Sequence, residues 1–168
     1  SVIPIFIRQI KQNLPLTVTD RKMTRFFMSM KEAVSLVISA SIKANGGEIF
    51  ILNMDSLRII DLAEAMIEVF GPRYDYNPKG RKIRIIGFGP GEKINEKLIT
   101  EQEAEEIVNI TKDDKLIVLK PRIAYLDSSK VCIRKDKQLS ELTSDNSKLL
   151  TKEKIKKILR KENLEWLF

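Results

Sequence analysis

The sequence contains no histidine and only one cysteine, and these two absences exclude several chemistries. Without an imidazole there is no Ser-His-Asp or Cys-His unit and no histidine metal ligand. Cys132 can form neither a disulfide within the chain nor a cysteine-rich zinc site, so we interpret it as a small buried hydrophobic residue. We therefore expect no metal site, and we assign no catalytic residue to this chain.

Long apolar runs are also absent. No segment approaches the ~18 apolar residues that cross a bilayer, and no signal peptide opens the chain, so we expect a cytoplasmic protein without a membrane partner. The 168 residues, 43% hydrophobic and 32% charged, are typical of one soluble globular domain or part of a larger protein. Because Ser1 opens directly into an apolar helical pattern, we expect the second of these.

Outside one C-terminal segment, the positive and negative charges of the chain nearly balance. The net charge is +7, and most of it lies between residues 148 and 161. In a predicted helix there, six cations lie on the side opposite to an apolar stripe formed by Ile155, Ile158 and Leu159. Such a helix could meet nucleic acid or an anionic membrane surface, but more often its stripe docks on its own domain. We expect docking, and no nucleic acid partner.

Apolar periodicity predicts helices in the first part of the chain. Helical spacing of apolar residues runs from Ile3 to Ile10 and is broken at Asn13-Leu14-Pro15. Ser29 and Glu32 form a capping-box signature for a second helix. Along that helix an apolar stripe is formed by Val34, Val37, Ile38 and Ile42.

Strands are predicted between the helices. The segment 48–53 is apolar without alternation, which is typical of a strand buried on both faces in a parallel sheet. The rest of the pattern is a helix over 59–70 stopped by Gly71-Pro72, a strand over 82–86, a helix capped by Thr100 and Glu103, a strand over 115–120, a polar irregular segment 127–148 and a helix begun by Thr151. Helices that alternate with buried strands indicate a small α/β unit.

A glycine cluster at Gly87, Gly89 and Gly91 follows a predicted strand and invites a dinucleotide-binding interpretation. The G-x-G-x-x-G fingerprint requires glycine where Glu92 stands, and Pro90 lacks a backbone N–H that such a loop would use. We therefore interpret the cluster as a rigid turn that places Glu92.

The segment from Thr19 to Phe27 combines hydroxyls, cations and aromatic rings. Arg25 or Lys22 could hold a phosphorylated ligand by charge-assisted hydrogen bonds. The alternative, which the pattern by itself favours, is a solvated loop that runs into a core strand through Phe26 and Phe27.

Taken in order, several short motifs of this sequence resemble the C-terminal half of the polysaccharide-biosynthesis branch of the extended short-chain dehydrogenase/reductases. The most similar group is that of the inverting UDP-N-acetylglucosamine 4,6-dehydratases of capsule and related nucleotide-sugar pathways. The resemblance extends from residue 1 to about residue 159. It is carried by these motifs: Ser1-Val2-Ile3-Pro4, Thr19-Asp20, Met23-Thr24-Arg25-Phe26-Phe27, Gly46-Gly47-Glu48-Ile49-Phe50, Asp61-Leu62-Ala63-Glu64-Ala65-Met66, Pro90-Gly91-Glu92-Lys93 and Thr143-Ser144-Asp145-Asn146.

The resemblance implies an α/β substrate-binding domain that lacks the Rossmann half. We expect residues 1–126 to form the substrate-binding region, and residues 127–168 to add a polar connection and a basic helix to the same domain. The complete enzyme would use NADP: hydride leaves the sugar C4, water is eliminated across C5 and C6, and hydride returns to C6 with inversion at C5. The chain by itself, binding no cofactor, would be inactive.

The resemblance also implies site residues. By position, Val2 would line the nucleotide site, Thr19 would hydrogen-bond the UDP moiety, and Glu92 would accept hydrogen bonds from ligand hydroxyls. Arg25 is a further candidate for substrate binding. The family motif Arg-Pro-Gly-Glu places an arginine on the diphosphate, whereas this sequence has Gly89 there, so Arg84, Lys93 or Arg25 would have to compensate.

The partners implied are a UDP-sugar, the missing Rossmann half and further copies of the chain in a homo-oligomer. Two other functions stay open. One is a stand-alone basic module that uses its C-terminal helix on nucleic acid. The other is a degenerate relative that binds another phosphorylated ligand, or none, for which Gly89 is the main motivation.

Overall fold

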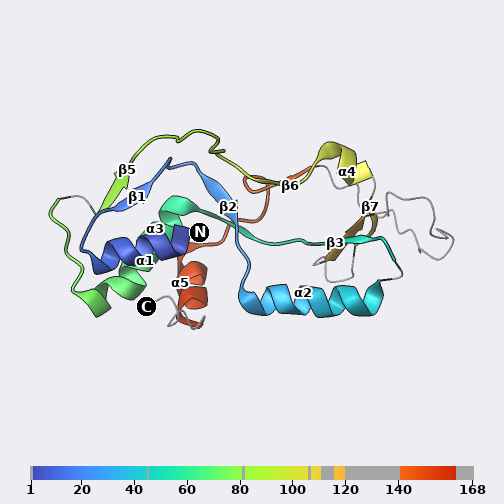
Figure 1. Ribbon diagram of the computed structural model, residues 1–168, viewed down its shortest axis with the longest axis horizontal. Helices are drawn as coiled ribbons and strands as arrows, with labels where there is room; N and C mark the ends of the chain where they lie inside the picture. Colours follow the sequence, from blue (N-terminus) through green and yellow to red (C-terminus); the bar gives the residue numbers. More distant parts are fainter. Residues whose placement is uncertain are drawn as a thin grey trace.

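The computed structural model describes residues 2–44, 46–80, 82–105, 107–110, 116–119 and 141–161 (Figure 1). Cys132 and most of the segment 127–148 lie outside these ranges. The elements are α1 (Val2–Lys11), β1 (Leu16–Val18), β2 (Thr24–Phe26), α2 (Met30–Lys43), β3 (Ile49–Leu52), β4 (Ser56–Arg58), α3 (Ile59–Phe70), the 3-10 helix η1 (Gly71–Tyr74), β5 (Ile83–Ile85), β6 (Lys97–Ile99), α4 (Glu101–Glu105), β7 (Ile107–Ile110), β8 (Leu116–Leu119), β9 (Leu142–Thr143) and α5 (Lys152–Lys161).

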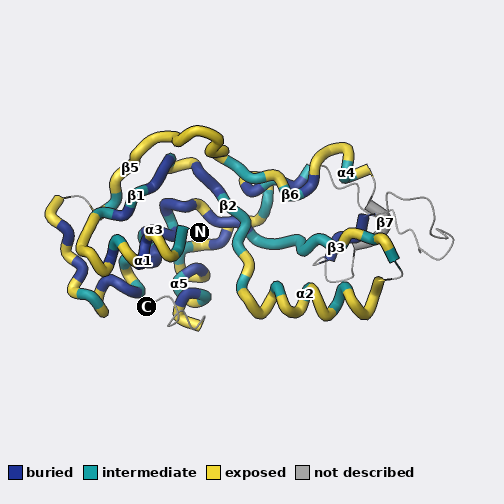
Figure 2. Tube along the Cα trace, viewed as in Figure 1, coloured by how far each residue is buried: buried dark blue, intermediate teal, exposed yellow. Residues whose placement is uncertain are grey.

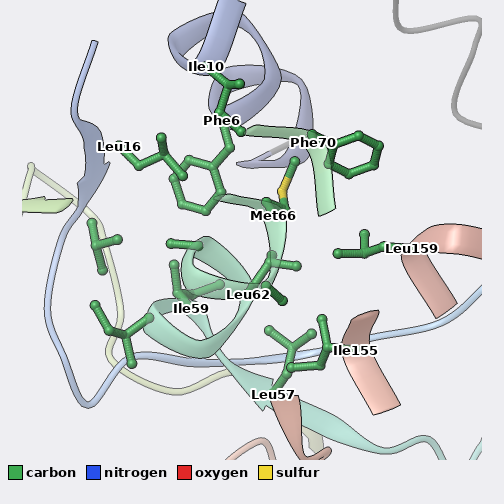
Figure 3. Close-up of a cluster of buried hydrophobic side chains, with 14 of the residues drawn as sticks. Phe6, Ile10, Leu16, Leu57, Ile59, Leu62, Met66, Phe70, Ile155 and Leu159 are labelled. Carbon is green, nitrogen blue, oxygen red and sulfur yellow. The ribbon is translucent and has the colours of Figure 1, made fainter. Parts of the chain in front are cut away.

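A larger core is built around α3. Phe6 and Ile10 of α1, Leu16 of β1, Met66 of α3 and Ile155 of α5 are almost fully buried against one another (Figure 3). The helix predicted from Ile3 to Ile10 is confirmed, and it ends before Asn13, whose φ of 54° is left-handed. Apolar residues at helical spacing thus bury one face of α1 and α3 in a shared core.

The basic helix α5 docks on α3, as predicted. Ile155 and Leu159 are buried in the larger core. On the rim, Lys152 Nζ lies 3.0 Å from Glu68 Oε1, and Lys156 Nζ lies 2.8 Å from Glu68 Oε2. The hydrogen bonds from Lys156 and Lys152 lower the pKa of Glu68, and the hydrogen bond to Glu68 raises the pKa of Lys152. Acidic side chains of α3 therefore form ion pairs with some of the lysines of α5.

A smaller core lies away from α1, α3 and α5, beside the three-stranded sheet of order β3-β8-β7 (Figure 1). Its buried members are Ile99 of β6, Ile117 and Leu119 of β8, and Leu142 of β9. Strand β6 pairs with β9, while β2 pairs with β4 between the two cores. Phe26 and Phe27 are half-buried, and each packs against one of the two cores.

Helix α2 has the predicted start. Glu32 N donates to Ser29 Oγ at 3.2 Å, and Ser29 N donates to Glu32 Oε2 at 2.8 Å, which completes the capping box. Its apolar stripe, however, is exposed: no residue of α2 is buried, and Val37 and Ile42 are 64% and 79% exposed (Figure 2).

The prediction of a parallel strand buried on both faces at 48–53 is wrong. Strand β3 pairs antiparallel with β8 at the end of its sheet, and Ile49 is 46% exposed. The reason is that the other described elements pack against β3 only in part, so that none of its four residues is buried. Parallel pairing occurs instead between β1 and β5. Within the described ranges, no helix is long and apolar enough to cross a membrane.

Candidate functional site

The site begins where the parallel strands β1 and β5 end. Thr17 pairs with Arg84, and Val18 pairs with Ile85. The pairing continues past both strands, because Gly87 N donates to the Thr19 carbonyl at 3.1 Å. Ligands of open α/β sheets bind beyond the carboxyl ends of the strands, and this is where the chain places Thr19 and the start of its glycine loop.

The glycine loop is the rigid turn that the sequence predicts. Glu92 N donates to the Gly89 carbonyl at 3.2 Å, with Pro90 and Gly91 between them. Gly91 has a φ of 78°, so the order Pro then Gly matches the central positions of a type II turn. Gly89 N in turn donates to Glu92 Oε2 at 3.0 Å. The carboxyl group of Glu92 is therefore held against its own turn.

Arg25 forms hydrogen bonds with the C-terminal end of the same loop. Its guanidinium donates to the carbonyl oxygens of Lys93 at 2.8 Å and Ile94 at 2.9 Å, and its Nε lies 3.4 Å from Glu96 Oε1. Thr24 N also donates to the Ile94 carbonyl. The segments 19–25 and 87–96 are thus joined at both ends, and we refer to them together as the double loop.

A buried pair of hydroxyl groups stabilises the double loop through hydrogen bonds. The Oγ1 of Thr24 and the Oγ of Ser144 are 2.6 Å apart, and both residues are buried. Thr24 Oγ1 also donates to Asn95 Oδ1, and Glu96 N donates to Ser144 Oγ. The word Thr143-Ser144-Asp145-Asn146 is present in the sequence, but nothing local indicates that its serine contacts a threonine 120 positions earlier.

The charges of the double loop suit an anionic ligand. Arg21, Lys22 and Lys93 are exposed, as is Arg84 of β5, and none of the four has an ion pair among the described residues. Asp20 Oδ1 accepts a hydrogen bond from Lys22 N, which closes the turn between β1 and β2. Cations on such a loop can hold phosphate oxygens by charge-assisted hydrogen bonds.

Three of the four residues predicted for substrate binding lie in the double loop. Thr19 is buried beside Gly87, Glu92 caps the glycine turn, and Arg25 holds backbone carbonyls. Val2 lies elsewhere, as the first residue of α1, and is half-buried against the larger core. Whether these residues contact a ligand remains a prediction. The described residues contain no cluster of three or more acidic, histidine or cysteine side chains that could hold a metal ion.

Comparison with known proteins identifies the class. A family model described as polysaccharide biosynthesis protein matches residues 1–119. An uncharacterized membrane protein of Methanocaldococcus jannaschii is 44% identical over 160 residues, and a UDP-glucose 4-epimerase of Rickettsia akari is 35% identical over 159 residues. Each match covers 95% of this chain and 45% of the relative. The chain belongs to the polysaccharide biosynthesis family, as its resemblance predicts.

A solved structure supports the same assignment. The X-ray structure of Pen from Bacillus thuringiensis aligns with a TM-score of 0.72 and 33% identity. The alignment covers 96% of this chain and 45% of the Pen chain. The chain therefore has the mixed α/β fold of part of Pen, and it spans less than half the length of the relatives it matches.

Proposed function

We propose that this chain is the substrate-binding part of a nucleotide-sugar dehydratase or epimerase of polysaccharide biosynthesis, with the UDP moiety bound at the double loop. The observation that carries the proposal is the joining of Thr19, Arg25 and Glu92 beyond the carboxyl ends of β1 and β5. A name of one relative, UDP-glucose 4-epimerase, supports a UDP-sugar as the ligand class.

Each of the four predicted site residues has a role in this proposal. Thr19 offers a hydroxyl that makes no hydrogen bond with other described residues. Glu92 uses Oε2 on Gly89 N, which leaves Oε1 to accept hydrogen bonds from ligand hydroxyls. Arg25 positions the loop through the carbonyls of Lys93 and Ile94. Val2 would line the nucleotide site from α1.

The diphosphate requires cations other than the arginine that the family has at position 89. Because the Arg25 guanidinium already contacts three carbonyl groups and Glu96, we assign the diphosphate to Lys93 and Arg84. Both are exposed and lie on either side of the glycine turn in the sequence. Lys93 is a compact point charge, whereas Arg84 can bind two phosphate oxygens at once.

The glycine loop of this chain does not fit a dinucleotide. Pro90 offers no N–H, and the Gly89 N–H is already bound to the carboxyl group of Glu92. We therefore place NADP on a Rossmann half outside this chain, and we derive no hydride step from the residues described here. In this proposal the chain binds and orients a UDP-sugar such as UDP-N-acetylglucosamine, and by itself it is inactive.

The proposal includes the organisation of the chain. Residues 1–126 form the substrate-binding region, and residues 127–168 add a polar connection and the basic C-terminal helix to the same domain. Burial of Ile155 beside Phe6 and Met66 supports one shared domain. A homo-oligomer of the complete enzyme is also part of the proposal.

Calorimetric titration with UDP, UMP and uridine tests the proposed function. We expect UDP to bind more tightly than UMP, and uridine to bind least, because the cations of the double loop recognise phosphate. Equal affinities for UDP and uridine would contradict the diphosphate site. Tight binding to nucleic acid that weakens steeply with salt, together with no UDP binding, would favour the basic module instead.

A further inference from the structure

Two buried hydroxyl groups connect the double loop to the C-terminal part of the chain, and counting their protons gives the direction of each hydrogen bond. Each hydroxyl carries one proton. Thr24 Oγ1 donates its proton to Asn95 Oδ1 at 2.9 Å, so Ser144 Oγ is the donor in the 2.6 Å contact between the two hydroxyls. Ser144 Oγ in turn accepts a hydrogen bond from Glu96 N at 2.9 Å. We call these bonds, from Glu96 N through Ser144 and Thr24 to Asn95, the hydroxyl network.

The hydroxyl network joins three segments of the chain. It begins and ends on the adjacent residues Asn95 and Glu96, and it passes through Thr24 of β2 and through Ser144, which follows β9. Backbone hydrogen bonds run alongside it, because Ser144 N donates to the Glu96 carbonyl at 2.8 Å and Thr24 N donates to the Ile94 carbonyl at 3.0 Å. A buried network whose members are all satisfied favours one arrangement of its segments.

Burial by itself does not require such a network, as a second serine shows. Ser56 and Ser144 are both 0% exposed, yet the hydroxyl of Ser56 makes no hydrogen bond with a described residue. The backbone N–H of each serine donates to a carbonyl, that of Lys148 or that of Glu96. The two serines therefore differ in the partners of their hydroxyl groups, and they form a matched pair for substitution.

The network ends close to the residues that the proposed function assigns to the ligand. Glu92 and Lys93 precede Asn95 by three and two positions, and both are exposed. A ligand that must order an exposed loop loses affinity through the entropy of ordering. A network that fixes residues 94–96 in the free protein removes part of this cost.

We propose that Ser144 is a positioning residue of the nucleotide site, which holds the double loop in its binding conformation through the hydroxyl network before a nucleoside diphosphate binds. This proposal rests on the proposed function. In the alternative, the network stabilises the fold and has no effect on binding. Positioning is favoured because both ends of the network lie on the loop, and because Arg25, beside Thr24, also donates to carbonyls of that loop.

Calorimetric titration with UDP tests the proposal, at a temperature at which circular dichroism shows every variant to be folded. Ser144→Ala removes one hydroxyl of the network, and Ser56→Ala is its control. Thr24→Val removes the other hydroxyl and keeps the shape of the side chain, whereas Thr24→Ser keeps the hydroxyl. If Ser144→Ala does not fold, the comparison of Thr24→Val with Thr24→Ser decides.

We expect Ser144→Ala and Thr24→Val each to weaken UDP binding at least about fivefold. Thr24→Ser and Ser56→Ala should stay within about twofold of the parent. The double variant of Ser144→Ala and Thr24→Val should lose less affinity than the two single losses combined, because both substitutions break the same network. Additive losses would show that the two hydroxyls act separately, and would overturn the proposal.

Hydrogen exchange without ligand gives a second measurement. The amides of Thr24 and Gly87 each donate to a carbonyl of the other loop. In Ser144→Ala they should exchange at least about tenfold faster than in the parent, and by a larger factor than amides of α3, because the double loop opens locally. Saturating UDP should reduce the difference. Equal exchange of these two amides in both proteins would contradict a positioning role.

The two hypotheses fail in different ways. If the parent binds UDP and the folded variants Ser144→Ala and Thr24→Val bind it equally well, Ser144 is not a positioning residue, even where both variants melt at lower temperature, and the proposed function stands. An equal loss of affinity in Ser56→Ala leads to the same conclusion, since any buried serine then has the effect. A parent chain that does not bind UDP contradicts the proposed function and this proposal together.

Discussion

At the scale of single residues, Gly89 stands where the family resemblance implies an arginine, and its geometry accepts a side chain. Only Gly87 and Gly91 of the glycine loop have a left-handed φ, near 79° and 78°. A Cβ on Gly89 would lie 3.8 Å from Glu92 Cδ and 3.8 Å from Glu92 Oε2, which is ordinary van der Waals contact. An arginine can therefore be introduced at Gly89 without backbone strain.

We expect Gly89→Arg to tighten UDP binding by up to about 1.5–3 kcal/mol, the contribution of a charged hydrogen bond. Part of this gain will be lost to Glu92, whose carboxyl group lies beside the new side chain. Calorimetric titration measures the change, with Gly91→Ala as the control. That substitution forces a left-handed alanine, which costs roughly 1–2 kcal/mol of stability and adds no cation. Unchanged affinity of a folded Gly89→Arg variant would remove the diphosphate from this loop.

In the proposed function, Glu92 contacts the sugar and not the nucleotide. We expect Glu92→Ala to weaken binding of UDP-N-acetylglucosamine by about tenfold or more, since a charged acceptor for ligand hydroxyls is lost. Binding of UDP by itself should weaken less. Glu92→Gln, which keeps an acceptor for Gly89 N, controls for disruption of the turn. If both ligands lose affinity equally in both variants, Glu92 supports the loop and does not contact the sugar.

At the scale of elements, the contact between α3 and α5 should depend on pH. The pKa of Glu68 is lowered, so its contribution is present above the unfolded pKa and is lost as pH falls through the folded value. The pKa values of Lys152 and Lys156 are raised, so their contribution is lost only as pH rises above their ordinary range. We expect thermal stability to decline below about pH 4.5 and again above about pH 10.5.

The variant Glu68→Gln isolates this contact. It should melt at a lower temperature than the parent near pH 7, and the difference should shrink as acidic pH protonates the carboxylate of the parent, whose pKa is lowered by its lysine partners. High salt should reduce the difference, because exposed ion pairs are screened. A difference that stays constant from pH 7 down to the lowest pH at which the protein is folded would show that Glu68 acts through packing. Circular dichroism melting at several pH values measures both.

The elements that the sequence predicts well are those whose signals are local. Capping boxes at Ser29 and Thr100 involve residues three positions apart, and both form. Strand pairing is not local: β1 and β5 join residues more than sixty positions apart, and no spacing in the sequence encodes that register. The same limit applies to the site. Short sequence motifs single out Thr19 and Glu92 as candidates, but the contact of Thr24 with Ser144 became visible only in the structure.

At the scale of the whole molecule, two cores predict two unfolding steps. Met66 is fully buried in the larger core and Ile117 in the smaller one, and the two clusters share no member. We expect Met66→Ala and Ile117→Ala each to cost about 2–5 kcal/mol in the body that contains it. Hydrogen exchange should show protection lost near the substituted core first. Uniform loss across both cores would show that they unfold as one cooperative unit.

The hydroxyl pair of Thr24 and Ser144 also sets an order of events during synthesis. A ribosome that has released residues up to 140 has made every residue of the double loop, but not the serine that holds Thr24 and Glu96. Closing a connection of 120 residues is slow compared with forming a local turn. Translation therefore completes the loops before the serine that stabilises them, and under the proposed function the nascent chain should gain affinity for UDP only after Ser144 has left the ribosome.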